Sequence, residues 1–471
     1  MSGGDSAEFS GGPGAVCIVG AGPAGLAQAR ACKAAGIAFE VFERHNGPGG
    51  IWDIENPGTP MYETAHFISS KTLSGFVDFA MPADYPDYPS HRQVLAYLKD
   101  FARAHGLTRH IAFGTAVERA EPDTGVGWQV RLSSGETRRF RALVCASGMT
   151  WHPALPGYPG AFTGELRHSV TYRGPEEFRG KRVLVVGGGN SGCDIACDAA
   201  GHAEAAWLSL RRGYHFIPKH IFGVPADVFG ASGPPLPLAL QQRVFQALLR
   251  LLTGDLRRLG LPKPDHRLFE SHPILNSLVL HHLSHGDLTA KPDVKELRGG
   301  TVVFQDGSEA EVDLIICATG YDWVIPYVDR GHFDWEGSRL KSYLSAFTRR
   351  DDLFTLGFLN TNAGVYGDFD RLAHMVTQFL LDQARDPARA ARFRQKIDGP
   401  RPDLGGGIRF VGSPRHASYL HHPAFQRYVE TLRKEMGWPA LEAGAFEALR
   451  AAAATGGGGA DGEAAAAGKA A

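Results

Sequence analysis

Residues 15–25 read AVCIVGAGPAG, an apolar stretch that runs directly into the glycine pattern GxGxxG and then into a helical stretch. In this pattern Gly20 permits a tight turn, Gly22 lets the backbone approach a pyrophosphate, and Gly25 lets the helix pack on the strand. Phosphates bind at such a helix N-terminus because its free N–H groups and its dipole attract anions. The stretch therefore predicts the strand, phosphate loop and helix that open a dinucleotide-binding domain.

The chain repeats this plan once. Residues 181–192, KRVLVVGGGNSG, again join an apolar strand to a glycine-rich loop and a helix. Each copy ends in a similar strand, RALVCASG at 141–148 and DLIICATG at 313–320, preceded by a hairpin with a Ser-Ser-Gly or Asp-Gly turn. The first motif glycine and the closing glycine are 128 residues apart in one copy and 133 in the other. The repetition predicts two nucleotide-binding domains built to one plan.

The predicted fold class is α/β, with two Rossmann-like domains of which the second is inserted in the first. The first is expected over residues 14–164 and 317–450, and the second over residues 165–316. Residues about 222–290 break the pattern of the second copy and are predicted as a helical insertion. Its stretch 241–252 has apolar residues at helical spacing; we interpret it as a helix packed on the domain, with a membrane-surface helix as the alternative.

The composition is that of an ordinary globular protein, with a formal net charge of -1. A nucleic acid or an anionic membrane would favour a basic excess, so neither is expected as a partner. The six cysteines form no CxxC pair, and no metal site is expected. With no apolar run near the roughly 18 residues needed to span a bilayer, a cytoplasmic location is expected. Residues 1–13 and 451–471 are of low complexity and are predicted to be disordered tails.

The first loop carries the features of an FAD site. The second strand, residues 38–42, ends in Glu43, 18 residues after Gly25, where a carboxylate accepts hydrogen bonds from ribose hydroxyls. The turn GPGGIW follows at 47–52, and Glu-Arg followed by Gly-Gly-x-Trp is typical of FAD domains in flavoproteins that bind two dinucleotides. We therefore expect FAD in this domain, against the alternative of a glycine turn without a ligand.

The second loop carries a different signal. Its second strand, residues 206–210, ends in Arg211-Arg212, 19 residues after Gly192. A carboxylate there would repel a 2′-phosphate, whereas a guanidinium binds it bidentately. The arginines therefore favour NADPH over NADH, the alternative being a solvated strand end. The inserted domain is thus the expected NADPH domain, and hydride is expected to pass from NADPH to the flavin.

Between the two copies, residues 162–172, FTGELRHSVTY, match the pattern FxGxxxHxxx(W/Y) of flavin-dependent monooxygenases. With GAGPAG, GGIW, PADYPDYPSHRQVLAYLKDFA, GGGNSGCDIA and CATGY, the chain is similar to that family from about residue 15 to residue 440. Because the pattern ends in Tyr172 rather than Trp-Pro, the chain resembles the N- and S-oxidising flavin-containing monooxygenases, a branch of class B, more than the Baeyer–Villiger enzymes.

The resemblance implies a course of reaction and a set of binding residues. NADPH reduces FAD, O2 adds at flavin C4a, and the hydroperoxyflavin oxygenates an amine or a sulfide in a site that excludes water, as in an N,N-dimethylaniline monooxygenase. His168 and Tyr172 are implied to shape the linker beside the nicotinamide, and a purely structural role for His168 stays open. The residues implied to bind FAD are Gly20, Gly22, Pro23, Ala24, Gly25, Glu43, Arg44, Gly50, Trp52 and Ser69, and those implied to bind NADPH are Gly187, Gly189, Asn190, Ser191, Gly192, Arg211, Arg212, Tyr172 and Thr319.

One segment departs from the family pattern. Many members carry Asn-Ser-Ser-Lys facing the flavin, where the amide helps to hold the hydroperoxide, and this chain has Ile68-Ser69-Ser70-Lys71. Isoleucine forms no such bond, so Ser69 and His66 are the candidate catalytic residues; in an extended segment His66 shares a face with Ile68. We hypothesise leaky coupling, with peroxide formed when no substrate is present. A pocket made more apolar for a different substrate is the alternative.

Other functions stay open at this point: a Baeyer–Villiger oxygenase, a monooxygenase for a keto acid, a poorly coupled NADPH oxidase, and a flavin-binding sensor or scaffold without catalysis. A small-molecule substrate and O2 are the expected partners, and a homodimer is left open. We expect the substrate pocket to be lined from residues 62–80, from the insertion 222–290 and from the helix after Gly364.

Overall fold

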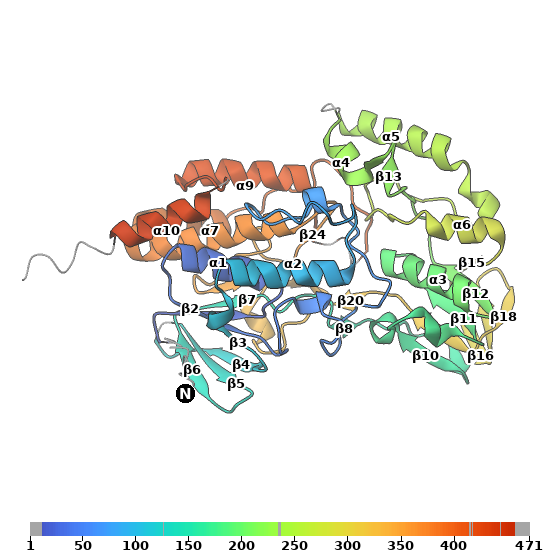
Figure 1. Cartoon of the computed structure of the whole chain (residues 1–471), viewed down its shortest axis with the longest axis horizontal. Coiled ribbons are helices and arrows are strands. Elements are labelled where there is room, and N and C mark those ends of the chain that lie inside the picture. The colour runs from blue at the N-terminus through green and yellow to red at the C-terminus, as the bar shows by residue number, and fades with distance from the viewer. Residues whose placement is uncertain are drawn as a thin grey trace, which may run out of the picture.

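The computed structural model describes residues 12–125, 127–233, 237–413, 416, 418–442 and 444–456. Two parallel five-stranded sheets organise the chain (Figure 1). The first has the order β23-β7-β1-β2-β3, and the second has the order β10-β19-β11-β12-β15. The strands of the first sheet are Leu353–Thr355, Ala142–Cys145, Val16–Val19, Phe39–Phe42 and Ile111–Ala112; those of the second are Glu165–His168, Leu314–Cys317, Arg182–Val186, Ala205–Leu210 and Thr289–Pro292, in the same orders.

The repeated plan of the sequence is visible in the two sheets. In each, the strand before the glycine loop lies between its closing strand and the next strand of the copy, as β7-β1-β2 and as β19-β11-β12. These strands are continuous apolar runs such as VCIV and LIIC, and every residue of β1 and β19 is buried. Such runs are typical of parallel sheets covered on both faces. The predicted α/β class with two Rossmann-like units is confirmed.

Helices cover the sheets. α1, Pro23–Ala34, packs against α7, Tyr366–Arg385, beside the first sheet, and α3, Asn190–His202, packs on β11 and β12 of the second. α1 is rich in alanine, so its backbone approaches its neighbours closely, and all but two of its residues are buried. α2, His91–Ala104, begins at a capping box in which Ser90 and Gln93 satisfy each other's backbone N–H groups.

Each unit carries a smaller antiparallel sheet. β4, β5 and β6, at Val117–Pro122, Trp128–Leu132 and Thr137–Phe140, form one, and the Ser-Ser-Gly turn joins its last two strands. β16, β17 and β18, at Val294–Gly299, Thr301–Phe304 and Glu309–Glu311, form the other, and the Asp-Gly turn joins its last two strands. Both hairpins predicted ahead of the closing strands are present.

The chain crosses between the two units through a short antiparallel ribbon. β8, His152–Pro153, pairs with β20, Tyr321–Asp322. β9, Gly160–Phe162, already pairs with β16 of the second unit, although the sequence placed it in the first domain, which was expected to run to residue 164. Three residues carry no alternation that would reveal this long-range pairing. The close contact requires glycine at 160, where φ is +89° and a Cβ would lie 2.0 Å from the Leu297 carbonyl oxygen.

After the return crossing, the chain completes the first unit with helices. They are α7, α8 at Pro387–Asp398, α9 at His422–Met436 and α10 at Ala445–Gly456. α10 corrects the predicted tail at its start: residues 451–456 continue this helix because their run of alanines has high helix propensity. Residues 1–11 and 457–471 of the predicted tails lie outside the described residues.

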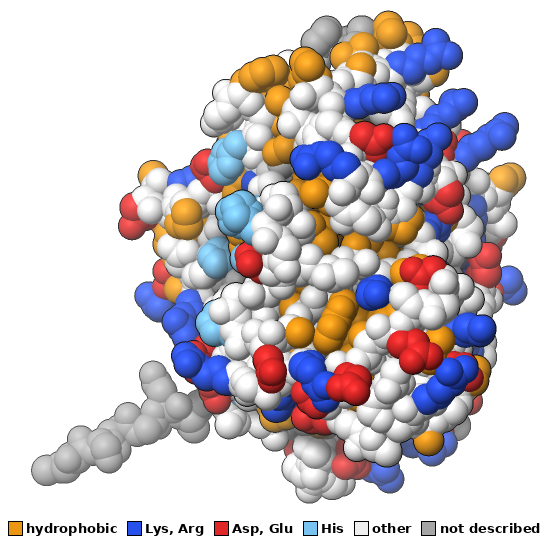
Figure 2. Space-filling model, turned by 90° about the vertical axis from the view of Figure 1, so that its right-hand side faces the viewer, with side chains coloured by type: hydrophobic (Ala, Val, Ile, Leu, Met, Phe, Trp, Pro, Cys, Tyr) orange, Lys and Arg blue, Asp and Glu red, His pale blue; other side chains and the backbone are white. Residues whose placement is uncertain are grey.

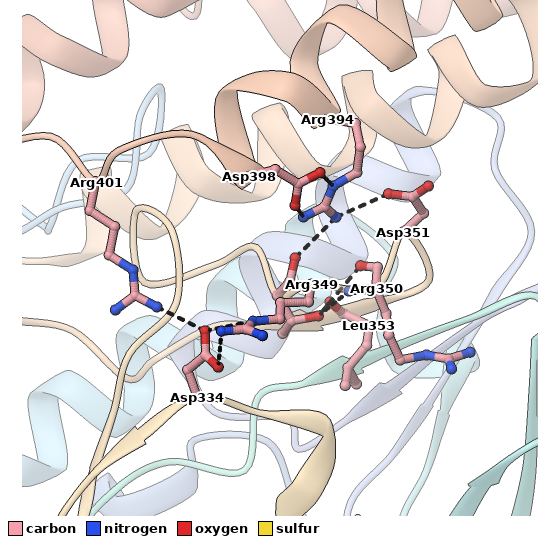
Figure 3. Close-up of polar contacts among 9 residues, drawn as sticks. Asp334, Arg349, Arg350, Asp351, Leu353, Arg394, Asp398 and Arg401 are labelled. Carbon is pink, nitrogen blue, oxygen red and sulfur yellow. Dashed lines mark hydrogen bonds and ion pairs between the residues drawn. The ribbon is translucent and has the colours of Figure 1, made fainter.

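Ion pairs fix α8 to the segment before β23 (Figure 3). Arg394 pairs with Asp398 at 2.7 Å and with Asp351 at 3.1 Å. Beside it, Asp334 pairs with both Arg349 and Arg401 at 3.0 Å. Exposed pairs contribute little singly, so this network matters mainly by holding α8 in one position against this segment.

The remaining short elements connect these parts. The two-residue pairs are β21–β22, at Trp335–Glu336 and Arg339–Leu340, and β24–β25, at Asn360–Thr361 and Tyr419–Leu420. The 3₁₀ helices η1 to η7 are Gly50–Trp52, Lys71–Leu73, Thr108–His110, Ser169–Thr171, Pro175–Phe178, Leu256–Leu259 and Arg330–His332.

The insertion forms one end of the molecule, at the upper right of Figure 1. It contains the hairpin β13–β14 at His220–Ile221 and Val224–Pro225, then α4 at Ala226–Ala231, α5 at Leu238–Thr253 and α6 at Leu278–His285. No helix among the described residues is long and apolar enough to cross a membrane.

Within the insertion α5 has two different sides. It buries Gln242 and Leu249 against the protein, as a packed helix would, while Leu240, Val244 and Leu251 are exposed. Figure 2 shows hydrophobic and basic side chains together along the upper edge of the face, where the insertion lies.

Candidate functional site

The first glycine loop has the geometry of a phosphate cradle. Gly20 has a φ of +106°, and a Cβ there would lie 2.6 Å from the Ala146 carbonyl oxygen. A Cβ on Gly25 would lie 1.9 Å from the carbonyl oxygen of Gly20, so the helix and loop approach too closely for any side chain. At Gly22 the nearest neighbour of such a Cβ is the Cα of Gly50 at 3.6 Å. Gly20 and Gly25 are therefore required by the fold, whereas Gly22 keeps a surface open to a ligand.

Glu43 lies at the end of β2, as predicted, and its side chain is buried. Its two carboxylate oxygens accept hydrogen bonds from the N–H of Ala21 at 2.7 Å and of His45 at 2.8 Å. The carboxylate is thereby held against the glycine loop, and each oxygen keeps a further lone pair for a ribose hydroxyl. The neighbouring Arg44 guanidinium lies over the ring of Trp151, 4.0 Å from its centre.

The turn after β2 approaches the same loop. Gly50 and Trp52 lie in η1, and the Trp52 ring packs against Phe67 at 5.0 Å between ring centres. Two buried polar atoms nearby, Asn56 Oδ1 and Ser70 Oγ, have no hydrogen-bond partner among the described residues. Orphaned acceptors and donors of this kind indicate a missing polar ligand. The residues of this region fit a flavin dinucleotide.

The second loop repeats the first. Gly187 has a φ of +117°, and a Cβ there would lie 2.4 Å from the Ala318 carbonyl oxygen; a Cβ on Gly192 would lie 1.9 Å from the Gly187 oxygen. In both copies the alanine of the closing strand packs against the last motif glycine, at 3.6 Å for Ala146 and 3.3 Å for Ala318, measured to the added Cβ. This contact explains why both closing strands continue with Cys-Ala and a small residue.

At the start of α3, two of the predicted NADPH residues are open to a ligand and one is bonded within the protein. Gly189 caps the helix and Ser191 is exposed, so both are open to a phosphate. Asn190 is engaged in the protein: its amide nitrogen donates to the Pro273 carbonyl at 3.2 Å, and its oxygen accepts from the Leu275 N–H at 3.0 Å. Its side chain therefore ties the insertion to the loop.

The two arginines after β12 also differ: one is bonded within the protein and the other is exposed. Arg212 donates to both carboxylate oxygens of Asp265, at 2.8 and 2.9 Å. Arg211 is exposed and has no hydrogen-bond or ion-pair partner among the described residues. Arg211 is therefore the guanidinium available to a 2′-phosphate.

His168 and Tyr172 of the monooxygenase pattern, together with Thr319, lie where the chain crosses between the two units. His168 Nε2 lies 2.9 Å from the carbonyl oxygen of Gly320 on the return crossing, and the Thr319 hydroxyl donates to the Ala154 carbonyl at 2.6 Å. Tyr172 is fully buried, and its hydroxyl donates to Asp198 of α3 at 2.9 Å. In this structure all three side chains hold the crossing strands and the flanking helix together.

Among the described residues, a cavity of about 1040 Å³ lies between the two units. Ile68 and Ser69 line it, and the Ser69 hydroxyl accepts a hydrogen bond from Ser74 at 2.8 Å. His66 is exposed, its ring bonds the Thr64 carbonyl at 2.8 Å, and it is not part of the lining. The geometry therefore gives no support to His66 as a substitute for the family asparagine.

The walls of the cavity come from the three predicted segments and from others that the sequence did not indicate, among them the start of α9. Phe76, Phe245 and Leu249 are among its apolar lining, from the expected segments. The start of α9 contributes His421, His422 and Gln426. The only local signal was the His-His-Pro run at the beginning of a helix, which by itself points to no chemistry.

A buried carboxylate organises the polar end of the cavity. Asp368, in the first turn of α7, is fully buried and accepts from His422 Nδ1 at 2.8 Å. It also accepts from Arg371 and from Gln426, both at 3.3 Å. All four residues line the cavity, as do apolar side chains of α5.

Known proteins resemble this chain along most of its length. Residues 14–391 match the family model described as flavin-binding monooxygenase-like. The indole-3-pyruvate monooxygenase YUCCA1 of Oryza sativa is 35% identical over 75% of this chain and 88% of its own length. The flavin-containing monooxygenase 5 of Oryctolagus cuniculus is 32% identical over 67% of this chain, which spans 63% of that relative's length.

The fold has matching solved structures. The NADP+-bound cyclohexanone monooxygenase of Rhodococcus sp. Phi1 superposes with a TM-score of 0.64, at 19% identity, over 89% of this chain and 97% of the other. The cofactors of the matching family are FAD and NADPH, which confirms the pair predicted from the sequence. The chain belongs to the flavin-binding monooxygenase-like family of flavoproteins.

Proposed function

We propose that this chain is an NADPH- and O2-dependent monooxygenase that oxygenates a soft nucleophile, an amine or a sulfide, in the cavity between its two units. The observation that carries the proposal is the position of that cavity. Ile68 and Ser69, on the side of the first glycine loop, and Leu275, which bonds Asn190 of the second loop, line the same space. When bound, FAD accepts hydride from NADPH and supplies activated oxygen to the substrate.

The first loop is proposed to hold FAD. Gly22 and Gly50 leave room for the pyrophosphate at the N-terminus of α1, and Glu43 accepts the ribose hydroxyls from its fixed position. Trp52 and Ser69 are proposed to bound the flavin end of the site. Gly20, Pro23, Ala24 and Gly25 would act through the same loop, and Arg44 would act from the end of β2.

The second loop is proposed to hold NADPH. Gly189 and Ser191 present the N-terminus of α3 to the pyrophosphate, and Arg211 binds the 2′-phosphate. Arg212 supports the strand end through Asp265 rather than touching the nucleotide. His168 and Thr319 join the crossing strands beside the expected nicotinamide position, and their role is positional.

A keto acid is a second candidate substrate. Arg371 lines the cavity, its side chain is about one-third exposed, and only NH1 bonds Asp368. Its remaining N–H groups suit a carboxylate. The relative named indole-3-pyruvate monooxygenase supports this reading for a related chain.

Two measurements test the proposal. First, the FAD-loaded protein is mixed anaerobically with NADPH; loss of flavin absorbance is expected, and its absence would leave a binding protein without this chemistry. Second, NADPH consumption and product mass are measured with an amine, a thioether and an aryl keto acid. Oxygen in the amine or thioether product supports the leading candidate, and oxidation of the keto acid alone supports the second. Peroxide as sole product with all three would make the chain an oxidase.

A further inference from the structure

His422 and Asp368 form a buried pair at the polar end of the cavity, and neither position was singled out by the sequence. The His422 ring is 21% exposed and lines the cavity, whereas Asp368 behind it is fully buried. The His422 backbone N–H donates to the Asn362 side chain at 3.0 Å, which fixes the start of α9 against the loop before α7. The backbone at His422 is thereby fixed, and the imidazole is held through Nδ1.

The pair fixes where the imidazole carries its proton. A carboxylate oxygen only accepts, so His422 Nδ1, 2.8 Å from Asp368 Oδ2, carries the hydrogen. The lone pair is then on Nε2, which has no hydrogen-bond partner among the described residues. A histidine oriented by a buried carboxylate in this manner is suited to accept a proton, because the carboxylate stabilises the imidazolium that forms.

We propose that His422 Nε2 accepts the proton of an ammonium substrate in the cavity, and that amines protonated at neutral pH are the substrate class for which it is needed. This inference rests on the proposed function. An ammonium nitrogen has no lone pair with which to attack oxygen, so R–NH3⁺ must become R–NH2 first. The proton goes to Nε2, giving an imidazolium paired with Asp368, and no other bond changes.

The surroundings favour this transfer. Phe76, Phe245 and Leu249 make the cavity largely apolar, and burial in apolar surroundings disfavours the charged form of an amine. The proton therefore moves from a poorly solvated nitrogen to one that faces a fixed carboxylate.

Other charged groups face the pair. Arg371, from α7, bonds Asp368 and opposes a cation, while Gln426, from α9, bonds the same carboxylate without charge. His421, beside His422, has a lowered pKa because it is buried and lies near Arg427 and His422. Arg371 thus disfavours a substrate that keeps its positive charge, in agreement with loss of the proton on binding.

A pair of substrates separates the proton step from binding and folding. NADPH-dependent oxygenation is measured with phenethylamine and with methyl phenethyl sulfide, which has no proton to lose. At pH 7.5 we expect His422→Gln to lower kcat/KM for the amine about 100-fold and to change it for the sulfide less than about 3-fold. Raising the pH until the free amine is neutral in solution restores the amine reaction. Equal losses for both substrates would overturn the proposal.

Two further variants serve as comparisons. Asp368→Asn, at a positioning residue, is expected to lower the amine reaction selectively as well, because it no longer fixes the proton on Nδ1. The matched control is His282→Gln, which removes a partly buried histidine, 16% exposed, that is bonded through Nδ1 to Asp287 at 3.1 Å, outside the cavity. It is expected to alter neither reaction.

A readout without turnover distinguishes this proposal from the proposed function. The ring nitrogens of His422 are followed by NMR in the ¹⁵N-histidine-labelled FAD-loaded protein, with His422→Gln identifying the signal. Adding phenethylamine is expected to move the signal to imidazolium values, and the sulfide is not. A signal that the amine leaves unmoved overturns the proposal even if the amine is oxygenated. A moved signal without oxygenation upholds the proton acceptor and refutes the proposed oxygenation.

Discussion

Arg212 Nη2 donates to both carboxylate oxygens of Asp265, at 2.8 and 2.9 Å, while Arg211 beside it is exposed. Adjacent residues of one type therefore have different roles at the end of β12. Both residues follow Leu210, the last residue of β12, where the chain bends. The Arg212 side chain meets Asp265 of the insertion, whereas the Arg211 side chain meets solvent. Replacing each arginine in turn therefore gives a matched pair of variants, one at the exposed residue and one at the bonded residue.

Arg211→Ala is expected to weaken NADPH binding, because it removes the free guanidinium proposed to hold the 2′-phosphate. One charge-assisted hydrogen bond contributes about 1.5–3 kcal/mol, so Kd for NADPH should rise roughly 10- to 100-fold while that for NADH stays the same. Arg212→Ala should act mainly on stability. Calorimetric titration of both variants with both nucleotides tests this, and equal losses for NADH and NADPH would refute the assignment.

Gly22→Ala and Gly25→Ala are expected to fail in different ways. The added methyl at Gly22 meets only Gly50 Cα at 3.6 Å, so this variant should fold yet lose FAD, since the methyl occupies the pyrophosphate approach. At Gly25 it would lie 1.9 Å from a carbonyl oxygen and should prevent folding. Flavin content after purification and circular dichroism measure the two effects. A Gly22→Ala protein that retains FAD would place the cofactor elsewhere.

Ile68→Asn is expected to reduce the release of peroxide. Ile68 lines the cavity and has no polar atom in its side chain, whereas an amide there can donate to bound cofactor atoms. The ratio of H2O2 formed to NADPH consumed without substrate should fall several-fold in the variant. Ile68→Leu, which adds no amide, controls for packing. Negligible peroxide from the unaltered protein would remove the leaky-coupling hypothesis.

Asp370→Asn is expected to destabilise the protein by about 3–5 kcal/mol, because it leaves the buried charge of Arg30 without a carboxylate to balance it. The two side chains are 3% and 0% exposed and their ion pair measures 2.6 Å. Burial raises the pKa of Asp370 to about 6 despite this arginine, so desolvation outweighs the attraction. Replacing both residues, Arg30→Met with Asp370→Leu, should therefore cost less than the single change. Urea unfolding compares them, and a more damaging double variant would contradict the argument.

His374→Gln is expected to change how stability depends on pH. Burial lowers the pKa of His374 from 6.5 to about 4, so its contribution is fully present above pH 6.5 and is lost as the pH falls through about 4. The variant should lose less stability than the unaltered protein between pH 7 and pH 4, by about 3 kcal/mol. Denaturant unfolding at several pH values measures the difference. His66→Gln, at an exposed ring, is the control, and a pH-independent difference for His374→Gln would contradict the assignment.

The sequence determined the two nucleotide loops and their local chemistry. At Gly20 and Gly187 the positive φ and the close approach to a carbonyl follow from residues that are near neighbours in the chain or in the adjacent strand. Glu43 at the end of β2 follows equally from the short distance between strand and loop. Contiguous segments of strand, turn and helix have their own conformational preferences, so such features can be predicted from the sequence before the fold is known.

Tertiary structure decided which of several chemically similar side chains bond within the protein and which stay exposed. Tyr172 and His168 match the family fingerprint, yet the fold uses them to hold α3 and the crossing strands. Arg212 and Asn190 form hydrogen bonds with residues of the insertion, and no local sequence pattern predicts these bonds. Long-range contacts select among chemically equivalent groups, and one sequence alone does not contain those distances.

The polar end of the cavity is the clearest case of a feature that the sequence alone could not predict. His422 and Asp368 are 54 residues apart, and their 2.8 Å contact exists only because α9 packs at the start of α7. The loops that bind dinucleotides are local and were predictable from their glycines. The cavity is assembled from the first unit, the insertion and the C-terminal helices, so its lining comes from segments far apart in the chain.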